Sequence, residues 1–139
     1  MKERIKAVAT RMLIAHGSAG LRFQQIADEL DCTRGNIHYY YRHKHQLIEA
    51  VTIEYCARTV ERFKSIWLSD TDLSEKIAES ASFNRSRYIQ FNPTGRSSHP
   101  WSLIARMRLE RDEITEAARE AVNTYTHELQ KCVFAGMRH

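Results

Sequence analysis

Residues 21–45 read LRFQQIADELDCTRGNIHYYYRHKH, and this stretch decides which fold the chain adopts. Its first apolar residues follow the helical spacing i, i+3, i+4 and i+7: Phe23, Ile26, Ala27 and Leu30. Asp31 and Cys32 then form a tight corner. Thr33 is placed to cap a second helix, over residues 34–40, with its hydroxyl. Two short helices joined by such a corner predict a helix-turn-helix.

The second of these helices is rich in groups that read DNA. Gly35 costs about 1 kcal/mol relative to alanine in a helix, but it lets another backbone approach closely. Arg34 suits guanine and Asn36 suits adenine in the major groove, while Tyr39 offers a flat ring to a thymine methyl group. His38 and Tyr40 offer hydrogen-bond donors to phosphate oxygens. An exposed helix with ordinary polar residues explains any one of them, but the full set favours a DNA-reading helix.

The next helix is predicted to begin near Lys44, within the basic run RHKH at residues 42–45. No acid follows until Glu49, although a helix N-terminus favours acids. His43 takes the cap position, where it is a poor capping residue, and a phosphate could supply the missing acceptor. The alternative is a solvated basic turn.

The histidines and cysteines do not form a metal-ligand pattern. His38 and His43 lie on different predicted elements, and neither has a carboxylate or thiol at ligand spacing. Cys32, Cys56 and Cys132 are few and widely spaced, which suits a reducing compartment. We therefore expect no metal and no cofactor.

Composition is that of a globular protein with a basic N-terminal end. The chain has 139 residues, 42% hydrophobic and 27% charged, with a net charge of +4. Residues 1–50 hold eight Lys/Arg against five Asp/Glu, which hints at a polyanionic partner. No apolar run is long enough for a membrane span, and the charged start lacks an export signal, so we expect a cytoplasmic protein.

The whole chain is expected to be helical, because no stretch alternates apolar and polar residues as a strand would. A first helix should end at Gly17. The long helix from Lys44 has an inward stripe: Ile48, Val51, Tyr55, Thr59, Phe63 and Trp67. A helix capped by Asp72 has another stripe: Leu73, Ile77, Ala81, Tyr88 and Phe91. The segment NPTGRSSH is a loop, Pro100 should open a helix, and a last helix should follow Asp112.

The stretch LRFQQIADELDCTRGNIHYYYRHKHQLIEAV, residues 21–51, resembles the DNA-binding region of tetracycline-repressor-like (TetR family) transcriptional regulators. The resemblance covers about residues 5–55. The residues that carry it are Ile26, Ala27, Cys32, Thr33, Arg34, Gly35, Asn36, Ile37, Tyr40, Tyr41, Lys44 and Leu47.

The resemblance implies an all-α protein with two parts. Residues 1–47 would form a three-helix DNA-binding domain with the helix-turn-helix, and residues 48–139 a helical effector-binding and dimerisation domain. The family commonly adds two further helices after the point where this sequence ends in VFAGMRH, so we expect this second domain to be incomplete. The implied function is a homodimeric repressor that binds a palindromic operator and is released by a small-molecule effector.

The resemblance also implies roles for individual residues. Those expected to contact DNA are Gln24, Thr33, Arg34, Gly35, Asn36, His38, Tyr39, Tyr40 and Lys44. Bases would be read by Arg34, Gly35, Asn36 and Tyr39, and phosphates bound by Thr33, His38, Tyr40 and Lys44. The chain departs from the family pattern at Arg22, His38, His43 and His45.

Six aromatic residues of the second part and one methionine are candidates for an effector pocket: Tyr55, Phe63, Trp67, Tyr88, Trp101, Tyr125 and Met107. A stripe of this kind can equally be plain core. Arg106, Arg108 and Arg111 could meet an acidic effector or simply face solvent.

No catalytic constellation is visible, so we expect no enzyme, although a histidine-based metal hydrolase is the enzymatic alternative. The second alternative is a small helical protein whose basic end binds nucleic acid without sequence preference.

Overall fold

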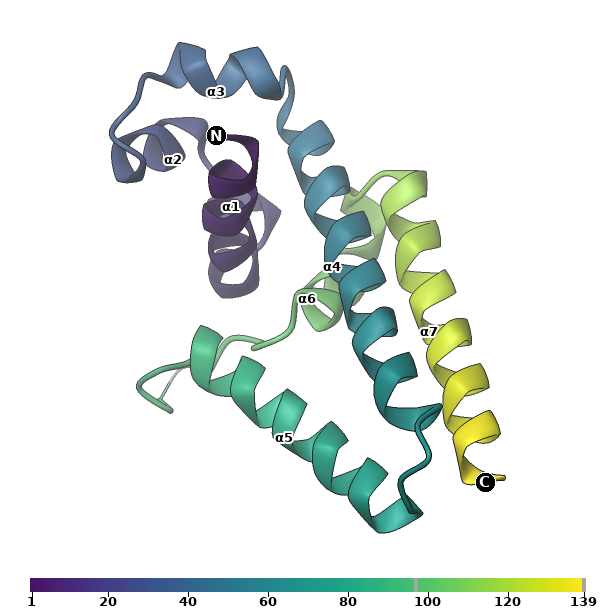
Figure 1. Cartoon of the computed structure of the whole chain (residues 1–139). Helices are drawn as coiled ribbons and strands as arrows, with labels where there is room; N and C mark the ends of the chain where they lie inside the picture. Colours follow the sequence, from purple (N-terminus) through teal and green to yellow (C-terminus); the bar gives the residue numbers. More distant parts are fainter. Residues whose placement is uncertain (97, 139) are drawn as a thin grey trace.

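The computed structural model describes residues 1–96 and 98–138. Within them the chain is entirely helical, with seven α-helices and two short 3-10 helices and no strand. This confirms the expected all-α fold (Figure 1). The elements in chain order are α1 (Lys2–His16), η1 (Ser18–Gly20), α2 (Phe23–Glu29), α3 (Arg34–Tyr40), α4 (Lys44–Trp67), α5 (Leu73–Phe91), α6 (Leu103–Leu109), η2 (Arg111–Glu113) and α7 (Glu116–Met137).

The first three helices pack together at one end of the molecule (Figure 1). α1 ends at Gly17, whose φ of 74° lies in the left-handed region that favours glycine. The corner between α2 and α3 turns at Asp31, with φ 54°. Ile37 of α3 is fully buried against this small core, and Tyr41 closes it from the end of the helix. The predicted end of α1 at Gly17 and the predicted bounds of α3 are confirmed, while α2 ends at Glu29, one residue before the predicted Leu30.

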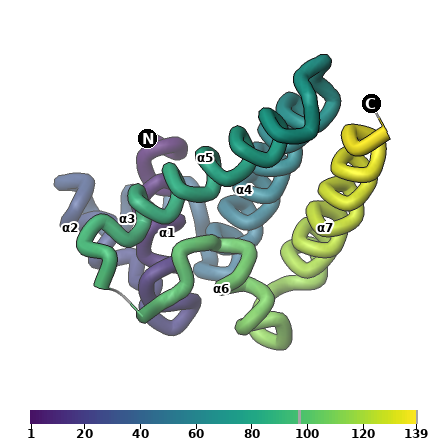
Figure 2. Tube along the Cα trace, turned by 90° about the horizontal axis from the view of Figure 1, so that it is seen from below, coloured from purple at the N-terminus to yellow at the C-terminus, as the bar shows by residue number. Residues whose placement is uncertain are grey.

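Helix α4 links this N-terminal group to the rest of the chain. It is continuous from Lys44 to Trp67, so it crosses the expected boundary at residue 47 without a break. Every residue of its predicted inward stripe is buried. α7 lies alongside α4 and runs in the same direction (Figures 1 and 2). The two helices approach most closely at Gly136, where an added Cβ would lie 2.3 Å from the carbonyl oxygen of Trp67.

The expected inward face of α5 is wrong. Leu73 and Ile77 are 48% and 55% exposed, while Lys76 is buried. The side that faces the core instead forms hydrogen bonds: Lys76 Nζ donates to the Gly136 carbonyl at 3.0 Å, and Ser80 Oγ accepts from Trp67 Nε1 at 2.9 Å. A cation at the C-terminal end of α7 is favoured by the helix dipole. Polar partners thus decide the orientation of α5.

The expected start of the sixth helix is also wrong. α6 begins at Leu103, three residues after Pro100, because Ser102 caps it by accepting from the Ala105 N–H. The last helix begins after Asp112 as expected, with Thr115 as its cap. Residue 97 of the expected loop and residue 139 lie outside the described residues. No helix in the described part of the chain is long and apolar enough to cross a membrane.

Gly136→Ala tests the close approach of α7 to α4. The new methyl group would meet the Trp67 backbone, which cannot yield as a flexible side chain would. We expect the free energy of unfolding to fall by about 1–3 kcal/mol, measured by urea denaturation. Gly35→Ala is the matched control, because its Cβ would meet only the Thr33 hydroxyl at 3.8 Å. The control should be neutral or stabilise by up to about 1 kcal/mol. Equal losses in both variants would contradict this packing.

Candidate functional site

The outer surface of α3 is built on a capped and anchored helix. The Thr33 hydroxyl accepts a hydrogen bond from the Asn36 N–H at 3.1 Å, as the sequence predicted. Ile37 fixes the inner side of the helix in the core. Tyr39 points outward and is 81% exposed. Gly35 is exposed and has room for a Cβ, so the protein's own packing does not require glycine there.

A groove of about 430 Å³ runs beside α3, between the start of α2 and the start of α4. It brings together four of the predicted DNA-binding residues: Gln24, Arg34, His38 and Lys44. Arg22 also lines it and is absent from the predicted DNA contacts. The sequence contained a signal for it, because Arg22 is one of the positions at which the chain departs from the family pattern. The lining has three cations, Arg22, Arg34 and Lys44, and no carboxylate.

Some predicted contacts are engaged within the chain. Gln24 Nε2 donates to Asp28 Oδ1 at 2.8 Å. The His38 ring packs on Phe23, with 4.8 Å between the ring centroids, and its Nδ1 lies 3.3 Å from the Arg42 carbonyl oxygen. These side chains would have to exchange a partner, or use their other polar atom, to reach a nucleic acid.

The start of α4 differs from the expectation of an uncapped helix. The Gln46 side chain reaches back and accepts hydrogen bonds from the N–H groups of Arg42 and His43, at 3.1 and 3.2 Å. A glutamine at this third helical position can serve as half of a capping box. His43 and His45 stack with their ring centroids 5.3 Å apart. The sequence suggested a phosphate as the missing acceptor at this helix start, and Gln46 supplies an acceptor within the chain, while Lys44 remains exposed.

The cysteines do not form a reactive centre. Cys56 is buried, and burial raises the pKa of its thiol to about 11. Burial also raises the pKa of the Cys132 thiol, whereas Cys32 is half-buried at the corner before α3. Since the thiolate is the nucleophile, neither buried thiol is activated. Over residues 1–96 and 98–138, no group of three or more His, Cys, Asp and Glu could hold a metal ion.

A second cavity lies between α4, α5, α6 and α7 and measures about 490 Å³. Four of the expected effector residues line it: Phe63, Trp67, Trp101 and Tyr125. The other three lie elsewhere. Tyr55 lines a separate cavity next to α1, and Met107 is fully buried beside a third. Tyr88 is 37% exposed and packs edge-on against Trp101.

Helix α6 joins this second cavity to the N-terminal helices. Arg106 donates to the carbonyl oxygens of Ile14 and Ala15 at the end of α1, at 3.0–3.2 Å. One turn later, Glu110 accepts from the Ser18 N–H at 2.8 Å. The cation thus meets a helix C-terminus and the carboxylate meets the start of η1, the arrangement that helix dipoles favour. Of the three arginines considered for an effector, Arg106 is a structural contact.

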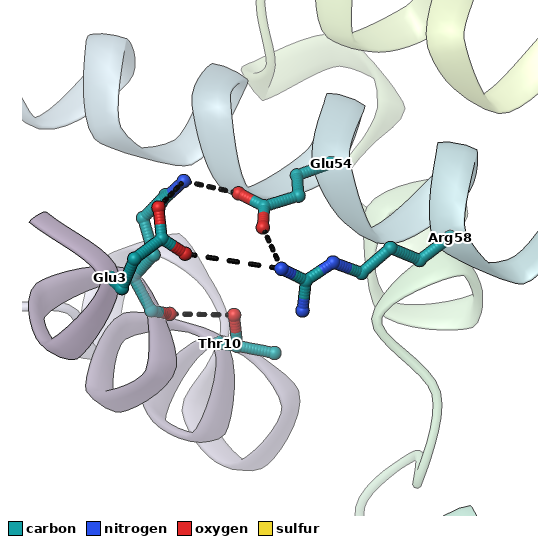
Figure 3. Close-up of polar contacts among 5 residues, drawn as sticks. Glu3, Thr10, Glu54 and Arg58 are labelled. Carbon is teal, nitrogen blue, oxygen red and sulfur yellow. Dashed lines mark hydrogen bonds and ion pairs between the residues drawn. The ribbon is translucent and has the colours of Figure 1, made fainter.

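Helices α1 and α4 are also joined by ion pairs (Figure 3). Lys6 pairs with Glu54 and with Glu3, the latter at 2.9 Å, and Arg58 pairs with Glu54 at 2.6 Å. The hydrogen bond to Glu54 raises the pKa of Lys6. The bond to Lys6 likewise lowers the pKa of Glu3. These exposed or half-exposed pairs position the two helices more than they stabilise them.

Comparison with known proteins agrees with the N-terminal helix-turn-helix and with the all-helical fold. Residues 5–51 match the model of a family described as "Bacterial regulatory proteins, tetR family". A TetR family regulator from Agrobacterium tumefaciens has a similar fold, with a TM-score of 0.81 and 15% identity, over 99% of this chain and 69% of that one.

Two further structures share the fold. A Legionella pneumophila TetR regulator has a TM-score of 0.74 at 17% identity, over 99% and 72% of the two chains. The reduced form of E. coli NemR has a TM-score of 0.76 at 16% identity, over 97% and 68%. No curated protein sequence matches the chain.

Arg106→Met tests the junction between α6 and α1. The variant keeps the aliphatic stem but leaves two half-buried carbonyl oxygens without their charged donor. We expect a loss of about 2 kcal/mol in the free energy of unfolding, measured by urea denaturation. Arg85→Met on the exposed side of α5 is the control and should change stability by less than about 0.5 kcal/mol. A loss no larger than in the control would show that these hydrogen bonds contribute nothing.

Proposed function

We propose that this chain, a DNA-binding transcription regulator whose residues 5–51 belong to the tetR family of bacterial regulatory proteins, represses its target genes and is released from DNA by a small-molecule effector. It would act in the cytoplasm as a homodimer on a palindromic operator. In such a complex two copies of α3 would enter successive major grooves, centred about 34–36 Å apart. We propose no catalytic role.

The groove beside α3 is the observation that carries this proposal. Its three cations stand beside the exposed Tyr39, on a helix whose glycine the protein's own packing does not need. Phosphate contacts fix a protein's register on DNA, while contacts to base edges give sequence preference. We assign the base contacts to Arg34, Gly35, Asn36 and Tyr39. We assign the phosphate contacts to Thr33, His38, Tyr40 and Lys44, with Gln24 and Arg22 at the edge.

The effector site of this proposal is the 490 Å³ cavity between α4 and α7. Its volume is within the range of small-molecule pockets, and aromatic rings dominate its walls. Residues of α6 line it, and Arg106 and Glu110 of the same helix hold the end of α1. An effector would change DNA affinity only by binding the two conformations with different affinity.

Selection of bound sequences from a random duplex pool, at physiological salt, tests the DNA part of the proposal. Enrichment of a palindrome supports a dimeric, sequence-specific regulator. Enrichment of a single half-site supports the base contacts and contradicts the dimer. Binding without enrichment that vanishes as salt rises would favour the alternative, a small helical protein that binds nucleic acid nonspecifically.

Single substitutions separate base contacts from phosphate contacts. Arg34→Ala and Asn36→Ala should each weaken operator binding by about 1–3 kcal/mol and relax preference at one base pair. Lys44→Ala should weaken binding to all duplexes alike and reduce the salt slope by about one unit. Fluorescence anisotropy with operator and scrambled duplexes measures both effects. If Lys44→Ala changed sequence preference instead, its assignment to a phosphate would be wrong.

The neutral aromatic probe N-phenyl-1-naphthylamine tests the effector cavity. Its binding there should quench the fluorescence of Trp67 and Trp101, which both line the cavity and are the two tryptophans of the chain. Ala105→Phe places a ring at the cavity wall and should weaken probe binding about tenfold or more. Ala117→Phe, on an exposed part of α7 outside this cavity, is the control. Equal affinity in both variants would place the probe elsewhere.

A further inference from the structure

A separate cavity of about 300 Å³ opens where α1, α4 and α5 meet. Lys6 and Thr10 of α1, Val51 and Tyr55 of α4, and Arg87 and Phe91 of α5 contribute to its lining. Among the described residues, it shares no lining residue with the 490 Å³ cavity. Its wall therefore joins a helix of the tetR-type domain to α5, which lies outside that domain.

Arg87 is the unusual group in this wall. Its guanidinium lies 4.0 Å from the centroid of the Tyr55 ring and 4.7 Å from that of Phe83. One nitrogen, Nη1, donates to Thr59 Oγ1 at 2.6 Å. Within residues 1–96 and 98–138, Arg87 forms no ion pair with a carboxylate.

A half-buried cation in this position is costly to the protein. Burial lowers the pKa of Arg87, so the surroundings do not compensate for the water that the guanidinium has lost. A guanidinium has five N–H donors in a planar fork that suits a carboxylate, and Thr59 uses only one side of it. The Tyr55 and Phe83 rings stabilise the guanidinium in part, and a carboxylate would add a partner of opposite charge.

The acidic residues of the cavity are already engaged. Glu3 and Glu54 pair with Lys6 and Arg58 along the α1–α4 contact (Figure 3). Their charges are balanced there and remain apart from Arg87. The rest of the wall includes apolar surface from Val51 and Phe91. A ligand that fits needs one anionic group for Arg87 and a small apolar body.

We propose that this cavity binds a small aromatic monocarboxylate, whose carboxylate accepts hydrogen bonds from the free side of the Arg87 guanidinium while its ring packs against Phe91 and Val51. The volume is at the lower end of the range for small-molecule pockets, which suits a single ring. This site is distinct from the proposed effector cavity, and its existence does not depend on repression or on effector release.

Benzoate and benzamide are the probes, because they have nearly the same shape and only benzoate is charged. Titration calorimetry on the full chain should show benzoate binding about tenfold or more tightly than benzamide. Benzoate should leave the tryptophan fluorescence unchanged, since Trp67 and Trp101 line the other cavity. Equal binding of the two probes, or no benzoate binding, would overturn the proposal. Quenching by benzoate would place the ligand in the other cavity and overturn it too.

Arg87→Met and Arg85→Met form the matched pair of variants. Both lie on α5, but Arg85 is exposed and does not line the cavity. Arg87→Met should remove the preference for benzoate over benzamide, and Arg85→Met should keep it. Unchanged preference in Arg87→Met would contradict the role of the guanidinium.

Discussion

Helix α4 is the element on which the rest of the molecule depends, because its buried residues face every other part of the chain. Its first buried residues, Leu47 and Ile48, close the small core beneath α3, and its last ones, Ile66 and Trp67, pack against the end of α7. A helix of 24 residues is nearly rigid, so a shift at one of these contacts moves the whole helix. The angle at which α3 is presented is therefore set by how α1, α6 and α7 hold α4. Ion pairs near the middle of α4 and the close approach at Gly136 near its C-terminal end act on the same helix.

The interior on the two sides of α4 has different chemistry. Four aromatic residues and one cation, Arg108, line the cavity toward α7, while five charged residues line the cavity toward α1: Glu3, Lys6, Glu54, Arg58 and Arg87. Helix α5 contributes to both cavities: Ser80 lines the cavity toward α7, and Arg87 lines the cavity toward α1. If both cavities are occupied in the cell, ligands at the two sites would affect each other's affinity reciprocally, since they share α4 and α5. The polar face of α5 thus has a functional as well as a structural explanation.

The sequence predicted the N-terminal helices closely and the later ones less well. Local rules decide the ends of α2 and α3: apolar spacing, a corner at Asp31 and a cap at Thr33 are all readable from neighbouring residues. Neither the buried side of α5 nor the start of α6 follows such rules. Lys76 is buried because its amine reaches Gly136, sixty residues away, and no local pattern announces that partner. Four of the nine residues predicted to contact DNA line the groove beside α3, and four of the seven effector candidates share one cavity.

The distribution of thiols makes the chain convenient for spectroscopy. Cys56 and Cys132 are buried with raised pKa values, while Cys32 is partly accessible and lies at the corner that leads into α3. A maleimide reagent at neutral pH would therefore label one position of the unmodified sequence, with no cysteine to remove first. A fluorophore attached there would stand one residue before the cap of α3. Its lifetime and anisotropy would report on the helix-turn-helix directly, in the presence of a duplex or of a small ligand.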